Sequence, residues 1–151
     1  MKNREVADMF YKVADMLAIR GDIIHRVLSY RRAAESIEAL GRDINQIYAE
    51  GTLTDIPGIG KTLADKIEEM LTTGHLEFYE RLSEEIPPSL VDMLRVEGLG
   101  PKRVKQVYDT LGVTTLDELQ AAAQAGKLRE LPKMGEKSEA KLIAAIEALS
   151  R

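Results

Sequence analysis

Hydrophobic residues recur at every third or fourth position along most of this chain, with polar residues between them. In the first such stretch, which Asn3 is expected to cap, the apolar positions are Val6, Phe10, Val13 and Leu17. In the second, which follows Gly21 and is expected to begin at a capping Asp22, they are Ile23, Val27, Tyr30, Ala34 and Ile37. This spacing is typical of amphipathic helices, and no segment alternates as a strand would. The pattern therefore predicts an all-α protein of short helices.

One short motif interrupts the helical pattern three times. It reads IPGIGK at residues 56–61, VEGLGPK at 96–102 and LPKMGEK at 131–137, where Lys133 replaces the first glycine. Gly58 and Gly60 supply backbone conformations that other residues rarely adopt. Each motif predicts a tight hairpin that leads directly into a helix, and we expect close backbone approach to be impaired in the third.

Each of the three motifs has a lysine at the expected N-terminus of a helix, where the helix dipole disfavours a positive charge. When they are aligned on Gly60, Gly100 and Gly135, a lysine follows within two residues of each glycine: Lys61, Lys102 and Lys137. The helix dipole opposes a cation at a helix N-terminus, and a bound anion removes that objection. We therefore predict phosphate sites made of backbone N–H groups around Gly58, Gly60, Gly98, Gly100 and Gly135. The alternative is that these lysines are simply solvated.

Composition limits the chemistry that the chain can perform. The 151 residues carry a formal net charge of −4, so nucleic-acid binding would have to come from local patches. Cysteine is absent and there are two histidines, which argues against a zinc site, and no cofactor is expected. No apolar run is long enough to span a membrane, so no membrane partner is expected. We expect a cytoplasmic protein that associates with the nucleoid.

Two further local signals concern organisation. Thr115 and Glu118 have the spacing of a capping box, which predicts a helix start at Thr115. The pair Pro87-Pro88 cannot lie inside a helix. It is the best boundary in the chain and predicts two small helical lobes, residues 1–86 and 87–151.

The order of these motifs resembles a known family. A helix with Tyr30-Arg31-Arg32-Ala33-Ala34 comes first, then the run from Ile56 to Ile67, then Thr73-Gly74, then the second and third hairpins. The hairpins are similar to helix-hairpin-helix motifs, and the whole chain resembles the N-terminal part of bacterial family X, DNA polymerase beta-like, DNA polymerases. The resemblance implies a lyase-like, 5′-phosphate-binding first lobe and a DNA-gripping second lobe. The palm with its metal-binding aspartates would begin beyond residue 151.

The resemblance also implies roles for particular residues. Lys66 matches the Schiff-base nucleophile of the family's lyases, and Asp65 matches a carboxylate that assists there. His25, Arg26 and Tyr30 match positions that line the family's phosphate pocket, although we expect the Tyr30 ring to lie in the core. Arg103 joins Lys102 among the phosphate-binding candidates of the second hairpin. This chain departs from the family pattern where lyase-active relatives often carry lysine, at Thr54 and Thr62.

Three functions remain open on the sequence. The first is sequence-independent binding of DNA at gaps, nicks or 5′-phosphate ends, without polymerase activity from this chain. The second is a deoxyribose-phosphate lyase that uses Lys66. The third is a protein-interaction module on the same fold, which the net charge favours and the three hairpin lysines oppose. Lys66 has its own bland interpretation as a solvated helix lysine, since Lys141 stands at the same offset in the third repeat.

Overall fold

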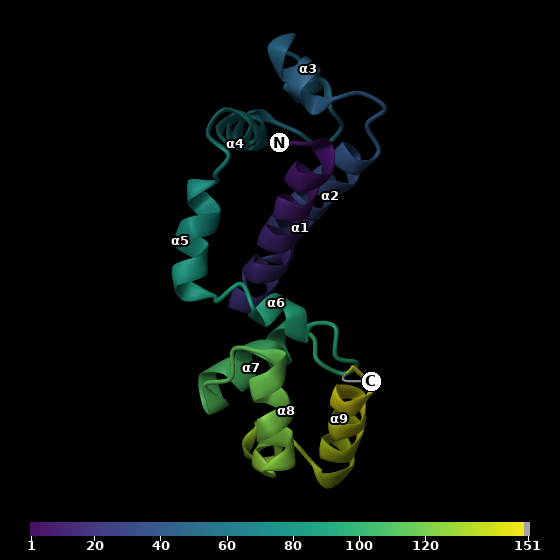
Figure 1. Ribbon diagram of the computed structural model, residues 1–151, viewed down its shortest axis with the longest axis vertical. Helices are drawn as coiled ribbons and strands as arrows, with labels where there is room; N and C mark the ends of the chain where they lie inside the picture. The colour runs from purple at the N-terminus through teal and green to yellow at the C-terminus, as the bar shows by residue number, and fades with distance from the viewer. Residues whose placement is uncertain (150–151) are drawn as a thin grey trace. The chain divides into compact units, whose positions relative to one another are not determined.

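The computed structural model describes residues 1–149, and this part of the chain is helical with no strand (Figure 1), as predicted. Two short 3-10 helices, η1 and η2, lie between the α-helices. The elements in chain order are α1 (Asn3–Arg20), α2 (Ile24–Glu38), α3 (Ile44–Ala49), η1 (Leu53–Asp55), α4 (Lys61–Thr73), α5 (Glu77–Glu85), α6 (Leu90–Met93), α7 (Pro101–Leu111), α8 (Leu116–Gln124), η2 (Lys127–Glu130) and α9 (Glu136–Leu149).

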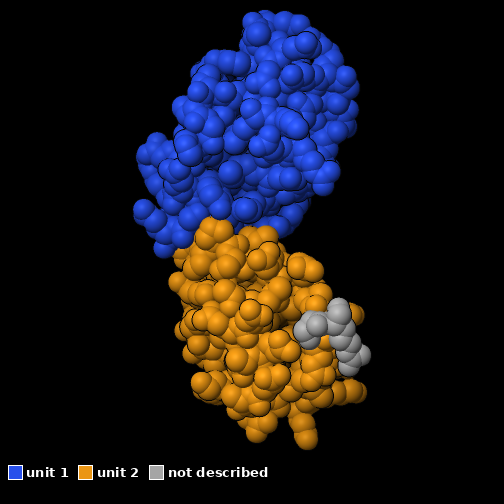
Figure 2. Space-filling model, viewed as in Figure 1, with its two compact units in different colours: residues 1–17, 22–84 blue, residues 18–21, 85–151 orange. Residues whose placement is uncertain are grey.

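The helices form two compact units, shown in Figure 2. The first contains residues 1–17 and 22–84, and the second contains residues 18–21 with the chain from residue 85 onward. The ranges 1–86 and 87–151 stay a prediction of domains, because compactness does not show which segments fold independently. The first unit holds one hairpin motif and the second holds two.

The apolar stripes predicted for the first two helices form the core of the first unit. Val6, Phe10, Val13 and Leu17 are fully buried on α1. On α2 the buried positions are Val27, Tyr30, Ala33, Ala34 and Ile37. The edge of the Tyr30 ring meets Phe10, with the ring centroids 5.6 Å apart. The Tyr30 ring therefore lies in the core, as predicted.

Two predicted helix caps are wrong, because their side chains bind elsewhere. The N-cap of α2 is Ile23, with no side-chain cap, and the Asp22 carboxylate instead pairs with Arg26 one turn into the helix, at 3.0 Å. The amide of Asn3 reaches the start of α3, where its oxygen accepts from the Ile44 N–H at 2.8 Å. Its nitrogen donates to the Arg42 carbonyl oxygen at 2.7 Å. Asn3 thus joins the first helix to the third.

The capping prediction at α8 is half confirmed. The Thr115 hydroxyl accepts from the Glu118 N–H at 3.1 Å, as a capping residue should. The Glu118 carboxylate, however, binds the N–H of Thr114 at 2.9 Å and the Thr114 hydroxyl at 2.8 Å. The Glu118 side chain therefore binds Thr114, the residue before the cap, and not the N–H of Thr115 as a capping box requires.

Candidate nucleic-acid interface

All three motifs fold into the same tight turn. In each, the fourth residue donates its N–H to the carbonyl oxygen of the first, and the pairs are Ile59 to Ile56 at 3.0 Å, Leu99 to Val96 at 3.0 Å and Met134 to Leu131 at 3.2 Å. The third residue has a positive φ, which is 81° at Gly58, 93° at Gly98 and 57° at Lys133. A turn of this kind favours glycine at that position. The third hairpin keeps the turn although lysine replaces the glycine.

The turn leads into a helix in the same way each time. The carbonyl oxygen of the second motif glycine accepts the first helical hydrogen bond: Gly60 from Ala64 at 2.9 Å, Gly100 from Val104 at 3.0 Å and Gly135 from Glu139 at 2.9 Å. Buried anchors, such as Ile56 and Leu99, hold the turns on the cores. Neither α4 nor α7 has a side-chain cap. Their first N–H groups therefore lack a side-chain partner and suit an anion.

Beside the first hairpin lies a hollow of about 420 Å³ in the first unit. Its walls come from α2, the hairpin turn and the start of α4, and they carry four cations and no carboxylate. The lining residues are Arg26, Ser29, Tyr30, Arg32, Gly58, Gly60, Lys61, Thr62, Leu63 and Lys66. In a chain of net charge −4, this is a local concentration of positive charge of the kind that binds phosphate.

The four cations of this cationic hollow differ in how they are held. Arg26 pairs with Asp22 at 3.0 Å, and Lys61 pairs with Asp65 at 3.3 Å. Arg32 and Lys66 form no ion pair within residues 1–149. The stem of Arg32 lies beside Gly58, where an added Cβ would come within 3.3 Å of its Cγ. Two cations are thus left with their charge available to a ligand.

The structure separates the residues that the family resemblance groups together. Arg26, Tyr30 and Lys66 line the cationic hollow, as do the hairpin residues Gly58, Gly60 and Lys61. Asp65 is exposed and lines a different, smaller hollow with Thr54. His25 is exposed and outside the lining, and its carbonyl oxygen accepts from the Ser29 hydroxyl at 2.9 Å.

Sequence reasoning did not single out three residues of this region. Ser29 and Arg32 line the hollow from α2, and two successive steps of three residues, from Arg26 to Ser29 and from Ser29 to Arg32, could have indicated them. Phe78 lies behind it on α5, stacked on Tyr30 with centroids 5.9 Å apart and ring planes 7° apart. Nothing in the local sequence relates Phe78 to α2, because the contact depends on how α5 packs.

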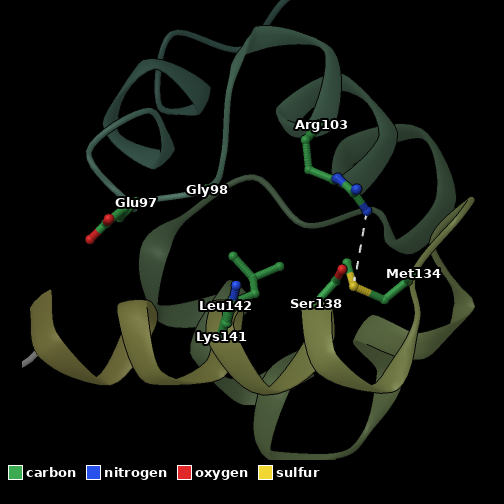
Figure 3. Close-up of a pocket in the computed structure, with 7 residues that line it drawn as sticks. All are labelled: Glu97, Gly98, Arg103, Met134, Ser138, Lys141 and Leu142. Carbon is green, nitrogen blue, oxygen red and sulfur yellow. Dashed lines mark hydrogen bonds between the residues drawn. The ribbon is translucent and has the colours of Figure 1, made fainter.

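In the second unit, the second and third hairpins flank a smaller hollow of about 190 Å³, shown in Figure 3. Its lining residues are Glu97, Gly98, Arg103, Met134, Ser138, Lys141 and Leu142. Arg103 Nη1 donates to the Pro132 carbonyl oxygen at 3.4 Å and lies 4.0 Å from Met134 Sδ. Figure 3 shows Arg103 and Met134 pointing toward each other. Arg103 therefore contacts the third hairpin directly.

The other predicted residues of the second unit lie on its surface. Gly100, Lys102, Gly135 and Lys137 are exposed, and none of them lines the smaller hollow. Within residues 1–149, no group of three or more acidic or histidine side chains could hold a metal ion. In the same part of the chain, no helix has both the length and the apolar character to cross a membrane.

Comparison with known families agrees with this geometry. Residues 1–76 match the family described as helix-hairpin-helix domain, and residues 90–148 match the SAM-like helix-hairpin-helix tandem. The chain belongs to the helix-hairpin-helix family. Its homologues include family X DNA polymerases, which confirms the resemblance seen in the order of the motifs.

Three relatives show the extent of this homology. The chain is 29% identical over 146 residues to the DNA polymerase/3'-5' exonuclease PolX of Bacillus subtilis. This alignment covers 97% of the chain and 25% of that protein. It is 29% identical to DNA polymerase lambda of Arabidopsis thaliana over 78% of the chain and 22% of the relative. It is 26% identical to DNA polymerase lambda of Rattus norvegicus over 80% of the chain and 20% of the relative. The chain thus spans about a quarter or less of these curated relatives.

Proposed function

We propose that this chain binds DNA without regard to sequence, at gaps, nicks and 5′-phosphate ends. The observation that carries the proposal is the cationic hollow, whose lining holds four cations beside the start of α4. Two of them, Arg32 and Lys66, form no ion pair within residues 1–149. A phosphomonoester carries about 1.5–2 negative charges near neutral pH, more than the single charge of an internal phosphodiester. A site with two cations that no carboxylate pairs favours the terminal phosphate.

The hairpin geometry supports contact with the sugar–phosphate backbone over contact with bases. Gly60 and Gly100 are exposed, and an added Cβ at either would meet nothing within 4 Å. A phosphate can therefore approach the N–H groups beyond them closely. Contacts of this kind position a protein on DNA but carry no sequence information. Binding through two such hairpins would be independent of sequence.

The direct experiment compares two gapped duplexes that differ only in the 5′-phosphate at the gap. We expect tighter binding to the phosphorylated duplex in fluorescence anisotropy titrations. If about three phosphates are engaged, log K should fall with log salt at a slope near −2.7. Arg32→Met should reduce the preference for the phosphorylated duplex. Arg4→Met is the matched control, because Arg4 lies on α1 with 88% of its side chain exposed and outside the hollow. Equal affinity for the two duplexes would refute the proposal.

A second candidate function is a deoxyribose-phosphate lyase, and the position of Lys66 favours it. Its amine lines the hollow and forms no ion pair within residues 1–149. A sugar attached to a phosphate held at the helix start would lie within reach of the amine. Attack on the C1′ aldehyde, with loss of water, gives an imine that borohydride reduces to a stable secondary amine.

Borohydride trapping on a DNA with a 5′-deoxyribose phosphate tests this second function. We expect trapping to be slow, because Thr54 and Thr62 supply no cation, and to disappear in Lys66→Ala while DNA binding is nearly retained. Lys141→Ala is the matched control, since Lys141 occupies the same offset in the third repeat and lines the other hollow. No trapping by the parent chain on saturated DNA would leave it a binding protein only.

A further inference from the structure

We propose that Phe78 is a positioning residue, whose ring holds Lys66 and Arg26 together at the cationic hollow. The Lys66 Nζ lies 5.1 Å from the centroid of the Phe78 ring, and the Arg26 Cζ lies 5.3 Å from it. Both distances are within the range of a cation–π attraction. The inference rests on the proposed function, since it assumes that these two cations meet a phosphate.

The ring is fixed to the core of the first unit by other aromatic residues. Phe78 stacks on Tyr30, and Tyr30 meets Phe10, which is fully buried on α1. Helix α5 itself is held at its start by the Glu69 carboxylate, which accepts from the Glu77 N–H at 2.8 Å. The Phe78 ring is half-buried, and its contact with Tyr30 ties it to this core.

The Phe78 ring can offset the repulsion between two cations of the hollow. Arg26 comes from α2 and Lys66 from α4, and two like charges on neighbouring helices repel each other when no ligand is bound. The Asp22 carboxylate offsets the charge of Arg26, but Lys66 has no carboxylate partner within residues 1–149. The negative face of an aromatic ring attracts both cations without neutralising either. Phe78 can therefore keep both side chains in place with their charges available.

Phe78 does not line the hollow, so it acts through the two cations and not by touching the ligand. Tyr79, the next residue on α5, offers a matched comparison, because its ring lies 5.7 Å from the Nζ of Lys12, a residue outside the hollow. Phe78→Leu and Tyr79→Leu each remove one aromatic ring from α5. Only the loss of Phe78 should affect the recognition of phosphate.

The first test is made on the free protein. Reductive methylation with ¹³C-formaldehyde labels the lysines, and the Lys66 signal is assigned by its absence in Lys66→Arg. We expect this signal to be shifted upfield by the ring in the parent protein and to lose the shift in Phe78→Leu but not in Tyr79→Leu. An unshifted signal in the parent would overturn the inference whatever the protein binds.

The second test uses the gapped duplexes with and without the 5′-phosphate. Phe78→Leu should reduce the preference for the phosphorylated over the 5′-hydroxyl duplex about two- to fivefold, and Phe78→Tyr should keep the preference of the parent. Pentafluorophenylalanine at position 78 keeps the shape of the ring but removes its negative face, so it should behave as Phe78→Leu does, even if the leucine variant is unstable. A preference that survives fluorination overturns the inference. Absence of any preference in the parent protein refutes the proposed function instead.

Discussion

Arg103 Nη1 donates a hydrogen bond to the carbonyl oxygen of Pro132 at 3.4 Å, so the helix of the second hairpin holds the turn of the third. The same guanidinium lies 4.0 Å from the sulfur of Met134. These contacts flank Lys133, which alone among the non-glycine residues of 1–149 has a positive φ, 57°. The turn of the third hairpin is thus contacted on both sides of Lys133 by Arg103, which lies on the helix of the second hairpin.

Arg103→Met should act mainly on stability. The variant keeps the aliphatic stem near Met134 but loses the hydrogen bond to Pro132, so we expect the free energy of unfolding to fall by about 0.5–1 kcal/mol. Lys102→Met is the matched control, because Lys102 is exposed one residue earlier on α7. In that variant, DNA affinity should fall while stability in urea titrations stays unchanged. The reverse pattern would place the guanidinium of Arg103 on DNA.

Lys133→Gly should stabilise the second unit. A non-glycine residue in the left-handed region costs roughly 1–2 kcal/mol, and part of this is offset by the greater freedom of glycine in the unfolded chain. We expect the free energy of unfolding to rise by about 0.5–1 kcal/mol, measured in urea. Gly98→Ala gives the reciprocal control, since Gly98 has a φ of 93° in the same place of the second hairpin and an added Cβ would meet no neighbour there. That variant should lose stability.

Gly100→Val should weaken DNA binding more than Lys133→Ala. Gly100 has a φ of −85° and a ψ of 177°, which any residue adopts, and a Cβ there meets nothing within 4 Å. The valine variant should therefore fold, but its side chain would stand where a phosphate approaches the N–H groups of α7. Losing one such charge-assisted hydrogen bond costs about 1.5 kcal/mol, roughly a tenfold change in Kd by anisotropy. A larger effect from Lys133→Ala would contradict the role of the second hairpin.

The start of α8 should make stability depend on pH. The N–H of Thr114, followed by the Thr114 hydroxyl, holds the pKa of Glu118 below its usual value. A carboxyl whose pKa is lower in the folded state stabilises the protein above the unfolded pKa of about 4.3, and this contribution is lost as the pH falls through the folded pKa. Glu118→Gln should therefore have a lower free energy of unfolding than the parent at pH 7, and this difference should shrink toward pH 3. If the difference in stability were the same at pH 3 as at pH 7, the charge of the Glu118 carboxylate would not be its cause.

Local patterns were enough to predict the helices and the three hairpins, and the order of these motifs along the chain resembled the family. Helical periodicity and turn chemistry act over a few residues, so Val6 to Leu17 predicted α1, and the motif of Ile56 to Lys61 predicted a turn and the helix after it. The same local logic failed for Asn3 and Asp22. Both are good capping residues, but a partner outside the cap position competed for each side chain.

Tertiary packing decided which of these residues share a site. Arg26 and Arg32 line the same hollow as Lys61 and Lys66 only because α2 and the start of α4 pack against one core. That packing depends on the burial of apolar residues that are far apart in the sequence. The same packing leaves Asp65 outside the hollow and brings Phe78 from α5 behind it. A residue's neighbours on its own helix follow from a spacing of three or four, whereas its neighbours on another helix follow from how the two helices pack. The family resemblance indicated Lys66, whereas nothing in the local sequence indicated the Phe78 ring beside it.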